Sequence, residues 1–201
     1  MRIRIKLVAA LVGVIVLTGA LVPSPLVRAA DTEPIVPMGA LAHAARALEQ
    51  DTNGKILEIR LTDDAGAPAF EAAIAKDDAL VYMRIESVSD NVTEIKVRDL
   101  PPWLLNYHLE AYMRSIVKAV VPLEQAIVAA EARAHAPAID AGVAKPLSGT
   151  NAVLAYFVET TKGKSSRGQF AVDAMTGASI ANPDELYEPH TPVDLARRLA
   201  P

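Results

Sequence analysis

Three stretches of the chain decide its fold: PLEQAIVAAE at residues 122–131, LAYFVE at 154–159 and VDAMTGASI at 172–180. In the first stretch, apolar side chains recur every three or four residues, which is the period of a helix with one buried face. That face holds Leu123, Ala126, Ile127 and Ala130, and the solvent face is expected to hold Glu124, Gln125, Glu131 and Arg133. The other two stretches alternate with period two, as antiparallel strands do when one face is solvated. Together they predict a helix followed by an antiparallel β-meander.

The third stretch contains a turn whose residues have a structural explanation. Asp173 can accept backbone N–H groups across the turn, and Gly177 can adopt the positive φ that such turns require. The alternative is that Asp173 is a ligand or a catalytic carboxylate. The structural role explains the residue without any further assumption, so it is the expectation here.

These three stretches resemble a PepSY domain over residues 121 to 181. That family has a short helix opening with Glu-Gln-Ala, a strand with an aromatic-x-Val step, and a closing Val-Asp-x-x-Thr-Gly hairpin. The resemblance marks five residues as a structural signature: Tyr156, Val158, Asp173, Thr176 and Gly177. It implies an α+β unit that binds and controls a partner, as PepSY units do in the propeptides of secreted metallopeptidases and in envelope proteins.

The same order of elements occurs earlier in the chain. Apolar residues from Met38 to Leu48 follow helical spacing, Asn53-Gly54 ends the helix, and strands are expected near 56–61, 70–74, 81–85 and 93–98. This first unit resembles the PepSY family more weakly, because its closing segment at residues 85–91 lacks the Thr-Gly pair. Three glutamates are expected on the solvated face of its sheet: Glu58, Glu71 and Glu86.

The predicted architecture is therefore α+β, with two PepSY-like units, each a helix packed on an antiparallel β-meander, joined by a linker helix. The units span residues 30–98 and 122–181, the linker helix 99–121, and a tail with a short helix 182–201. Spaced apolar residues in the linker run from Leu105 to Val120. Three aromatic residues there, Trp103, Tyr107 and Tyr112, are expected to pack between the units, with a partner interface as the alternative.

The N-terminus, residues 1–29, has the features of a cleavable export signal. Arg2, Arg4 and Lys6 precede an apolar run from Leu7 to Val22, and Val27-Arg28-Ala29 offers small residues for cleavage. The run is shorter than the roughly 20 residues that a helix needs to cross a bilayer, and two prolines follow it. We expect a bacterial periplasmic or secreted protein without a membrane anchor after cleavage.

Composition argues against several classes of function. Without residues 1–29 the chain carries 16 basic and 24 acidic groups, a net charge of −8, which disfavours binding to nucleic acid. There is no cysteine, and the four histidines, His43, His108, His135 and His190, lack metal-binding spacing. The sequence therefore predicts no cofactor, no metal and no catalytic constellation.

We expect an exported, non-enzymatic protein that inhibits or regulates a peptidase or another envelope partner by binding. One alternative is a periplasmic module that binds a peptide, a lipid or a small molecule. Another is a hydrolase whose site is assembled from scattered residues. The sequence does not indicate the oligomeric state.

Overall fold

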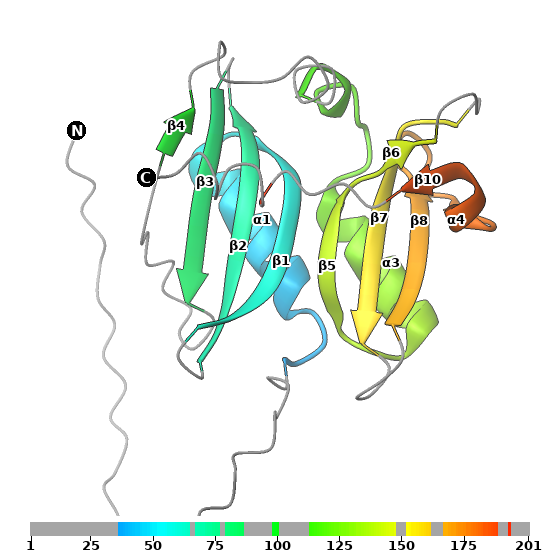
Figure 1. Ribbon diagram of the computed structural model, residues 1–201, viewed down its shortest axis with the longest axis horizontal. Coiled ribbons are helices and arrows are strands. Elements are labelled where there is room, and N and C mark those ends of the chain that lie inside the picture. Colours follow the sequence, from blue (N-terminus) through cyan, green and yellow to red (C-terminus); the bar gives the residue numbers. More distant parts are fainter. Residues whose placement is uncertain are drawn as a thin grey trace, which may run out of the picture. The chain divides into compact units, whose positions relative to one another are not determined.

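The computed structural model describes residues 36–64, 67–76, 79–86, 98–100, 113–147, 152–161, 167–188 and 193 (Figure 1). All of them belong to one compact unit, Glu33–Pro201. The expected signal peptide lies outside the described residues, and so do Trp103, Tyr107 and Tyr112.

The described residues form two successive sets of one helix and an antiparallel meander. We call residues 36–100 the first half and residues 113–188 the second half. The first half contains α1 (Ala40–Thr52), β1 (Lys55–Asp64), β2 (Ala67–Lys76), β3 (Ala79–Glu86) and β4 (Arg98–Leu100). The second half contains α3 (Leu123–Ala134), β5 (Ala138–Val143), β6 (Lys145–Pro146), β7 (Ala155–Thr161), β8 (Arg167–Asp173), β9 (Ser179–Ile180), α4 (Pro183–Leu186) and β10 (Tyr187–Glu188). The predicted α+β class is confirmed.

The two meanders join into one sheet, which the sequence did not indicate. The strand order is β4-β3-β2-β1-β5-β7-β8-β9, and every neighbouring pair is antiparallel. The junction is the pairing of β1 with β5, in which Ile59 lies opposite Ala141. A separate two-stranded sheet pairs β6 with β10.

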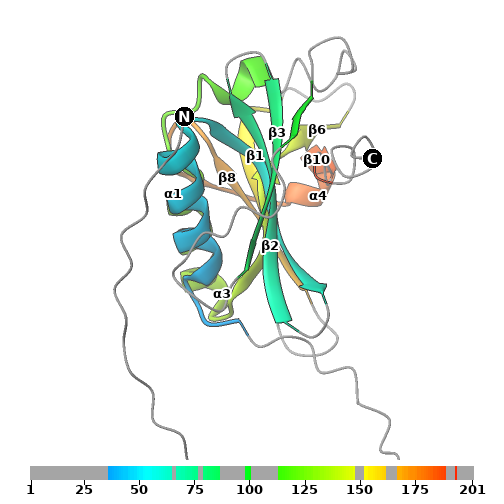
Figure 2. The same cartoon turned by 90° about the vertical axis from the view of Figure 1, so that its left-hand side faces the viewer.

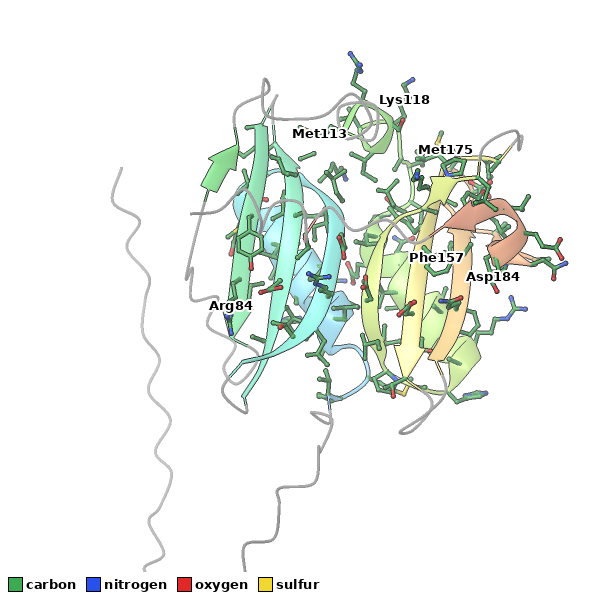
Figure 3. The ribbon with its side chains drawn as sticks, viewed as in Figure 1. Arg84, Met113, Lys118, Phe157, Met175 and Asp184 are labelled. Atoms are coloured by element: carbon green, nitrogen blue, oxygen red, sulfur yellow. The ribbon has the colours of Figure 1, made fainter. Side chains whose placement is uncertain are left out.

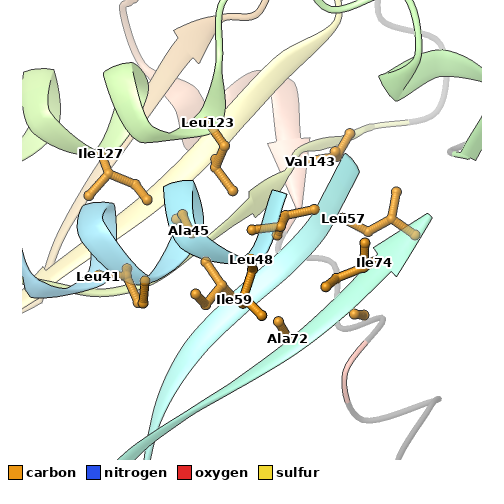
Figure 4. Close-up of a cluster of buried hydrophobic side chains, with 14 of the residues drawn as sticks. Leu41, Ala45, Leu48, Leu57, Ile59, Ala72, Ile74, Leu123, Ile127 and Val143 are labelled. Carbon is orange, nitrogen blue, oxygen red and sulfur yellow. The ribbon is translucent and has the colours of Figure 1, made fainter. Parts of the chain in front are cut away.

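Helices α1 and α3 lie on the same face of the large sheet (Figure 2). Their apolar sides and the facing strand residues make one core, in which Leu48, Ile59, Leu123 and Ile127 are almost completely buried (Figure 4). The guanidinium of Arg46 on α1 also donates to both carboxylate oxygens of Glu124 on α3, with Nε 2.7 Å from Oε2. The two halves therefore share both a sheet and a core.

The expectation that Glu58 and Glu71 face solvent is wrong, because their side chains are only 1% and 3% exposed. The second face of the sheet is covered around these two side chains. The carboxylate of Glu58 accepts the backbone N–H of Val193 at 2.8 Å, and the guanidinium of Arg60 lies within 4 Å of both glutamates. Charged groups can be buried when such partners satisfy them. Glu86 ends β3, and its side chain lies outside the described ones.

In the second half, this face is covered by apolar contacts. Phe157 of β7 and Tyr187 of β10 are buried there together with Ala144, Ala155 and Ala171 (Figure 3). Tyr187 donates its hydroxyl to the carbonyl of Val153 at 2.9 Å. The segment from α4 to β10 thus packs on the face opposite α1 and α3 (Figure 2).

Glu131 also departs from expectation, since it is 3% exposed although the helical pattern predicts that it lies on the solvent face. One carboxylate oxygen accepts the N–H of Gly39, at the start of α1, and the other accepts the N–H of Ala138, at the start of β5; both distances are 2.9 Å. An ionised carboxylate that receives two backbone N–H groups can be buried at this position. Glu131 connects three elements.

The linker and the tail are described only in part. Residues 113–116 are helical, but the helix does not continue to Val120, which is 68% exposed. Met113 and Ile116 are buried in the shared core. In the tail, Val193 is helical and fully buried, at the position where the sequence predicts a short helix.

Candidate interaction site

The Asp173–Gly177 hairpin has the geometry that its sequence predicts. One oxygen of the Asp173 carboxylate accepts the N–H groups of Met175 at 2.7 Å and Thr176 at 3.0 Å. Gly177 has φ of 76° and donates its N–H to the carbonyl of Asp173 at 2.8 Å. Thr176 adds a side-chain acceptor for the N–H of Ala178. These bonds give Asp173 a structural role in the turn.

Ala174 in this hairpin connects two distant segments. Its carbonyl accepts the N–H groups of Val120 at 3.0 Å and Val121 at 2.9 Å, and its own N–H bonds to the carbonyl of Leu154 at 2.9 Å. The end of the linker, the start of β7 and the hairpin are therefore held at one point. The hairpin therefore holds the segment that leads into α3.

Two further signature residues lie in the core beneath the hairpin. Val158 is completely buried, and Tyr156 is 2% exposed with its hydroxyl donating to the carbonyl of Val121 at 2.8 Å. Burial, and to a smaller extent the negative charge of Glu49, raise the pKa of Tyr156 well above its ordinary value. Tyr156 therefore stays neutral at physiological pH and acts as a packed hydrogen-bond donor.

The outer edge of β8 is the candidate interaction site. Strand β9 pairs only with Ala171 and Val172, although β8 begins at Arg167. Asp173 directs both its N–H and its carbonyl away from β7, toward Ala178 and Gly177. Because backbone groups alternate in direction along a strand, those of Gln169 and Arg167 also point outward. Within the described part of the chain, no strand pairs with this portion of the edge.

The side chains beside this open edge differ between the two faces. On the helix side, Phe170 is partly buried and its ring lies over Gly168, where an added Cβ would be 3.0 Å from the ring. On the opposite face, Gln169 is exposed and donates to Glu159 at 2.9 Å. Arg133 of α3 donates to the hydroxyl of Ser179 on β9. An added strand would thus meet the Phe170 ring and the Arg133–Ser179 pair on the helix side, and Gln169 on the other face.

The remaining candidate residues stay apart or lie outside the description. His43 is exposed on α1 and His135 is exposed at the C-cap of α3, whereas His108 and His190 are not described. Among the described residues, no group of three or more His, Asp or Glu side chains is placed to hold a metal ion. Trp103, Tyr107 and Tyr112, the candidate interface residues, lie outside the described part of the chain.

Sequence reasoning missed the buried carboxylates of Glu58 and Glu131. Both residues occupy polar positions of an amphipathic pattern. Such a pattern shows on which face of a helix or strand a residue lies, but it does not show whether another segment covers that face. Glu131 had one readable signal, because Glu49 occupies the same position relative to the end of the preceding helix. The partner of Glu58 lies 135 residues away, so no local pattern could identify it.

Comparison with known proteins finds a distant structural similarity to one solved structure. A crystal structure of a candidate lipoprotein from Clostridium difficile 630 is similar to it with a TM-score of 0.42 and 18% sequence identity, covering 68% of this chain and 87% of that one. No family model matches the sequence. No curated protein matches it either. Within the described residues, no helix has the length and apolar character needed to span a membrane.

Proposed function

We propose that this protein is an exported, PepSY-like binding protein without enzymatic activity, which holds an extended segment of a protein partner against the outer edge of β8. The observation that carries the proposal is that β9 covers only part of the outer edge of β8. Strand β9 pairs with two residues of β8, and the backbone groups of Gln169 and Arg167 point outward beyond it. An exposed edge of this kind can accept another strand through main-chain hydrogen bonds.

The class of partner follows from the resemblance and from charge. PepSY units accompany secreted metallopeptidases, so a peptidase or a peptidase-associated chain is the proposed partner. The expected mature chain has a net charge of −8, which favours a basic partner and faster association at low salt. The carboxylates of Glu58, Glu71 and Asp173 engage backbone or guanidinium groups.

The test is a titration of the protein from residue 30 onward against secreted and periplasmic peptidases of its source organism, at two salt concentrations. We expect saturable, stoichiometric inhibition, stronger at low salt, without consumption of the protein. If instead the protein turns over a peptide or an ester, and one carboxylate or histidine substitution abolishes that activity, the proposal is wrong. Absence of any effect on the peptidases, together with a co-purifying small molecule, would favour a small-molecule binding module.

A pair of substitutions at one position locates the site. Gln169→Pro removes the outward N–H of residue 169, whereas Gln169→Ala removes only the side chain. We expect Gln169→Pro to weaken partner binding about tenfold, the equivalent of one lost hydrogen bond plus a steric clash, and Gln169→Ala to change it less than about twofold. Equal losses for both variants would place the contact on the side chain and not on the strand edge.

Export is tested separately. The charged N-terminus and short apolar run predict a mature protein that begins at Ala30 or Asp31. N-terminal sequencing of protein released by osmotic shock measures this directly. Recovery of a chain that begins at Met1 in the membrane pellet would contradict it.

A further inference from the structure

The helix and the first strand of the two halves repeat each other at a constant separation of 82 residues. In the first half, Glu49 on α1 accepts the N–H of Ile56 at 3.2 Å, seven residues further along. In the second half, Glu131 on α3 accepts the N–H of Ala138 at 2.9 Å, again seven residues further along. Glu49 and Glu131 differ by 82 in number, and so do Ile56 and Ala138. The same helix-to-strand connection is therefore built twice.

Two further features follow the same offset. Both helices end on a residue in the left-handed conformation, Asn53 with φ of 53° and His135 with φ of 51°. The strand that follows then shifts register against its neighbour, between Ile56 and Glu58 in β1 and between Ala138 and Asp140 in β5. Neither feature is required by a meander, so their recurrence at one offset indicates an internal duplication.

The junction between the halves is symmetric under this offset. Ile59 of β1 lies opposite Ala141 of β5, and these two positions are themselves equivalent. On one side of this pair Glu58 lies opposite Gly142, and on the other side Arg60 lies opposite Asp140. Replacing each residue of the first pair by its equivalent in the other half gives the second pair. Equivalent strands also follow one another in the same order on both sides of this point. They are β1-β2-β3-β4 on one side and β5-β7-β8-β9 on the other. A pseudo-two-fold axis passes between Ile59 and Ala141.

We infer that the β1–β5 junction is a self-complementary interface, and that a second copy of this chain can complete it by exchanging halves. In a two-fold interface, each partner presents the same surface to the other. Here the edge of β1 in one copy meets the edge of β5 in another with the register that it has within one chain. The result is a swapped dimer with two such junctions, and it does not involve the outer edge of β8.

The linker determines which form is populated. Residues 101–112 can span about 40 Å when extended, whereas β4 and β5 are four strand spacings, or about 19 Å, apart. Because the two halves belong to one chain, the second half has an effective concentration near the first that is in the millimolar range for short linkers. At micromolar concentration the chain therefore closes on itself. The exchanged dimer forms when the protein refolds at high concentration or when the linker is shortened.

The test uses two single-cysteine variants of the full mature chain, which has no cysteine of its own. One carries Ile59→Cys and the other Ala141→Cys, at two fully buried positions that face each other. Opposed residues in antiparallel strands have Cα separations within the range of a disulfide. Neither variant can form this disulfide within one chain, so a covalent heterodimer reports a junction between two chains.

We expect the variants, unfolded together, refolded at high concentration and then oxidised, to give at least tenfold more covalent dimer than either variant treated alone in the same way. Folding them separately before mixing should give none, because exchange requires the halves to separate. Removal of residues 103–111 should raise the heterodimer fraction several-fold. If both variants refold, by circular dichroism, and no heterodimer forms, the inference is wrong. Should the core cysteines prevent folding, Arg60→Cys and Asp140→Cys form the next pair in the same register, and absence of heterodimer there overturns the inference too.

Discussion

Buried carboxylates connect separate elements of this protein by accepting their backbone N–H groups. Glu131 accepts N–H groups from Gly39 and Ala138, so one side chain joins α3 to the start of α1 and to β5. Its equivalent, Glu49, accepts one N–H at 3.2 Å and remains partly accessible beside Lys55. The two positions therefore allow the same substitution to be compared in a buried and in a more exposed setting.

Glu131→Ala should lower the free energy of unfolding by about 3 kcal/mol, because it leaves two N–H groups without their acceptor in the interior. Glu49→Ala, the matched control, should cost about 1 kcal/mol. Urea unfolding monitored by circular dichroism gives both values. Equal costs would show that burial of the Glu131 carboxylate does not contribute to stability.

Tyr156 is expected to make the protein sensitive to alkali. Its pKa is raised by burial in the folded state, while in the unfolded chain it is about 10. Below pH 10 the hydroxyl is protonated in both states and its contribution is complete. As the pH rises above 10, only the unfolded state loses the proton, so stability falls until the folded pKa is reached.

Between pH 8 and 11 the wild type should therefore lose about 1.4 kcal/mol more stability than Tyr156→Phe, which has no hydroxyl to ionise. At pH 7 the wild type should be the more stable of the two proteins, because Tyr156→Phe loses the hydrogen bond to Val121 at a cost of about 1 kcal/mol. Urea unfolding across this pH range measures the difference. Parallel pH profiles for the two proteins would mean that Tyr156 ionises as readily in the folded state as in the unfolded state.

At the scale of elements, the junction of β1 and β5 depends on a close approach of two backbones. A Cβ at Gly142 would lie 2.6 Å from the carbonyl oxygen of Leu57 and 3.0 Å from the Cα of Glu58. Both atoms belong to the main chain of β1 and cannot move alone. Gly168 on β8 is also crowded, but there the neighbours are the ends of the Thr160 and Phe170 side chains.

Gly142→Ala should consequently destabilise the protein by about 2 kcal/mol or more, although alanine is otherwise the better residue in a strand. Gly168→Ala should cost less than about 1 kcal/mol, since side-chain ends can rotate away. Thermal unfolding of the two variants compares them directly. A larger loss at Gly168 would place the critical contact at β8 and not at the junction.

Both main helices and most strands could be predicted from the sequence, because their periodicity and end signals are local. Asn53-Gly54 ends α1 as expected, and the Asp173–Gly177 turn has its predicted bonds. Two features could not be predicted. The pairing of Ile59 with Ala141 joins residues 82 positions apart, and the cover on Glu58 comes from Val193. Alternation in a strand indicates two faces, but it does not show whether a distant segment covers the polar one.

At the scale of the whole molecule, the halves share one sheet, one core and the contacts of Glu131 and Arg46 between them. Neither half can unfold without exposing the edge of its partner strand and the apolar side of the other helix. Coupling of this kind makes unfolding cooperative, as in a small single domain. Two units connected only by a linker would instead unfold independently.

The mature protein should therefore unfold in a single calorimetric transition, with a calorimetric enthalpy close to the van't Hoff enthalpy. Glu131→Ala, a change in the second half, should lower the melting temperature of the entire transition by roughly 6 to 12 °C, given 2 to 4 °C per kcal/mol for a chain of this size. Gly142→Ala should in addition broaden the transition, because it weakens the connection that couples the halves. Two resolved transitions in the wild type, only one of which moves in Glu131→Ala, would show that the halves are independent and that the β1–β5 pairing contributes little to stability.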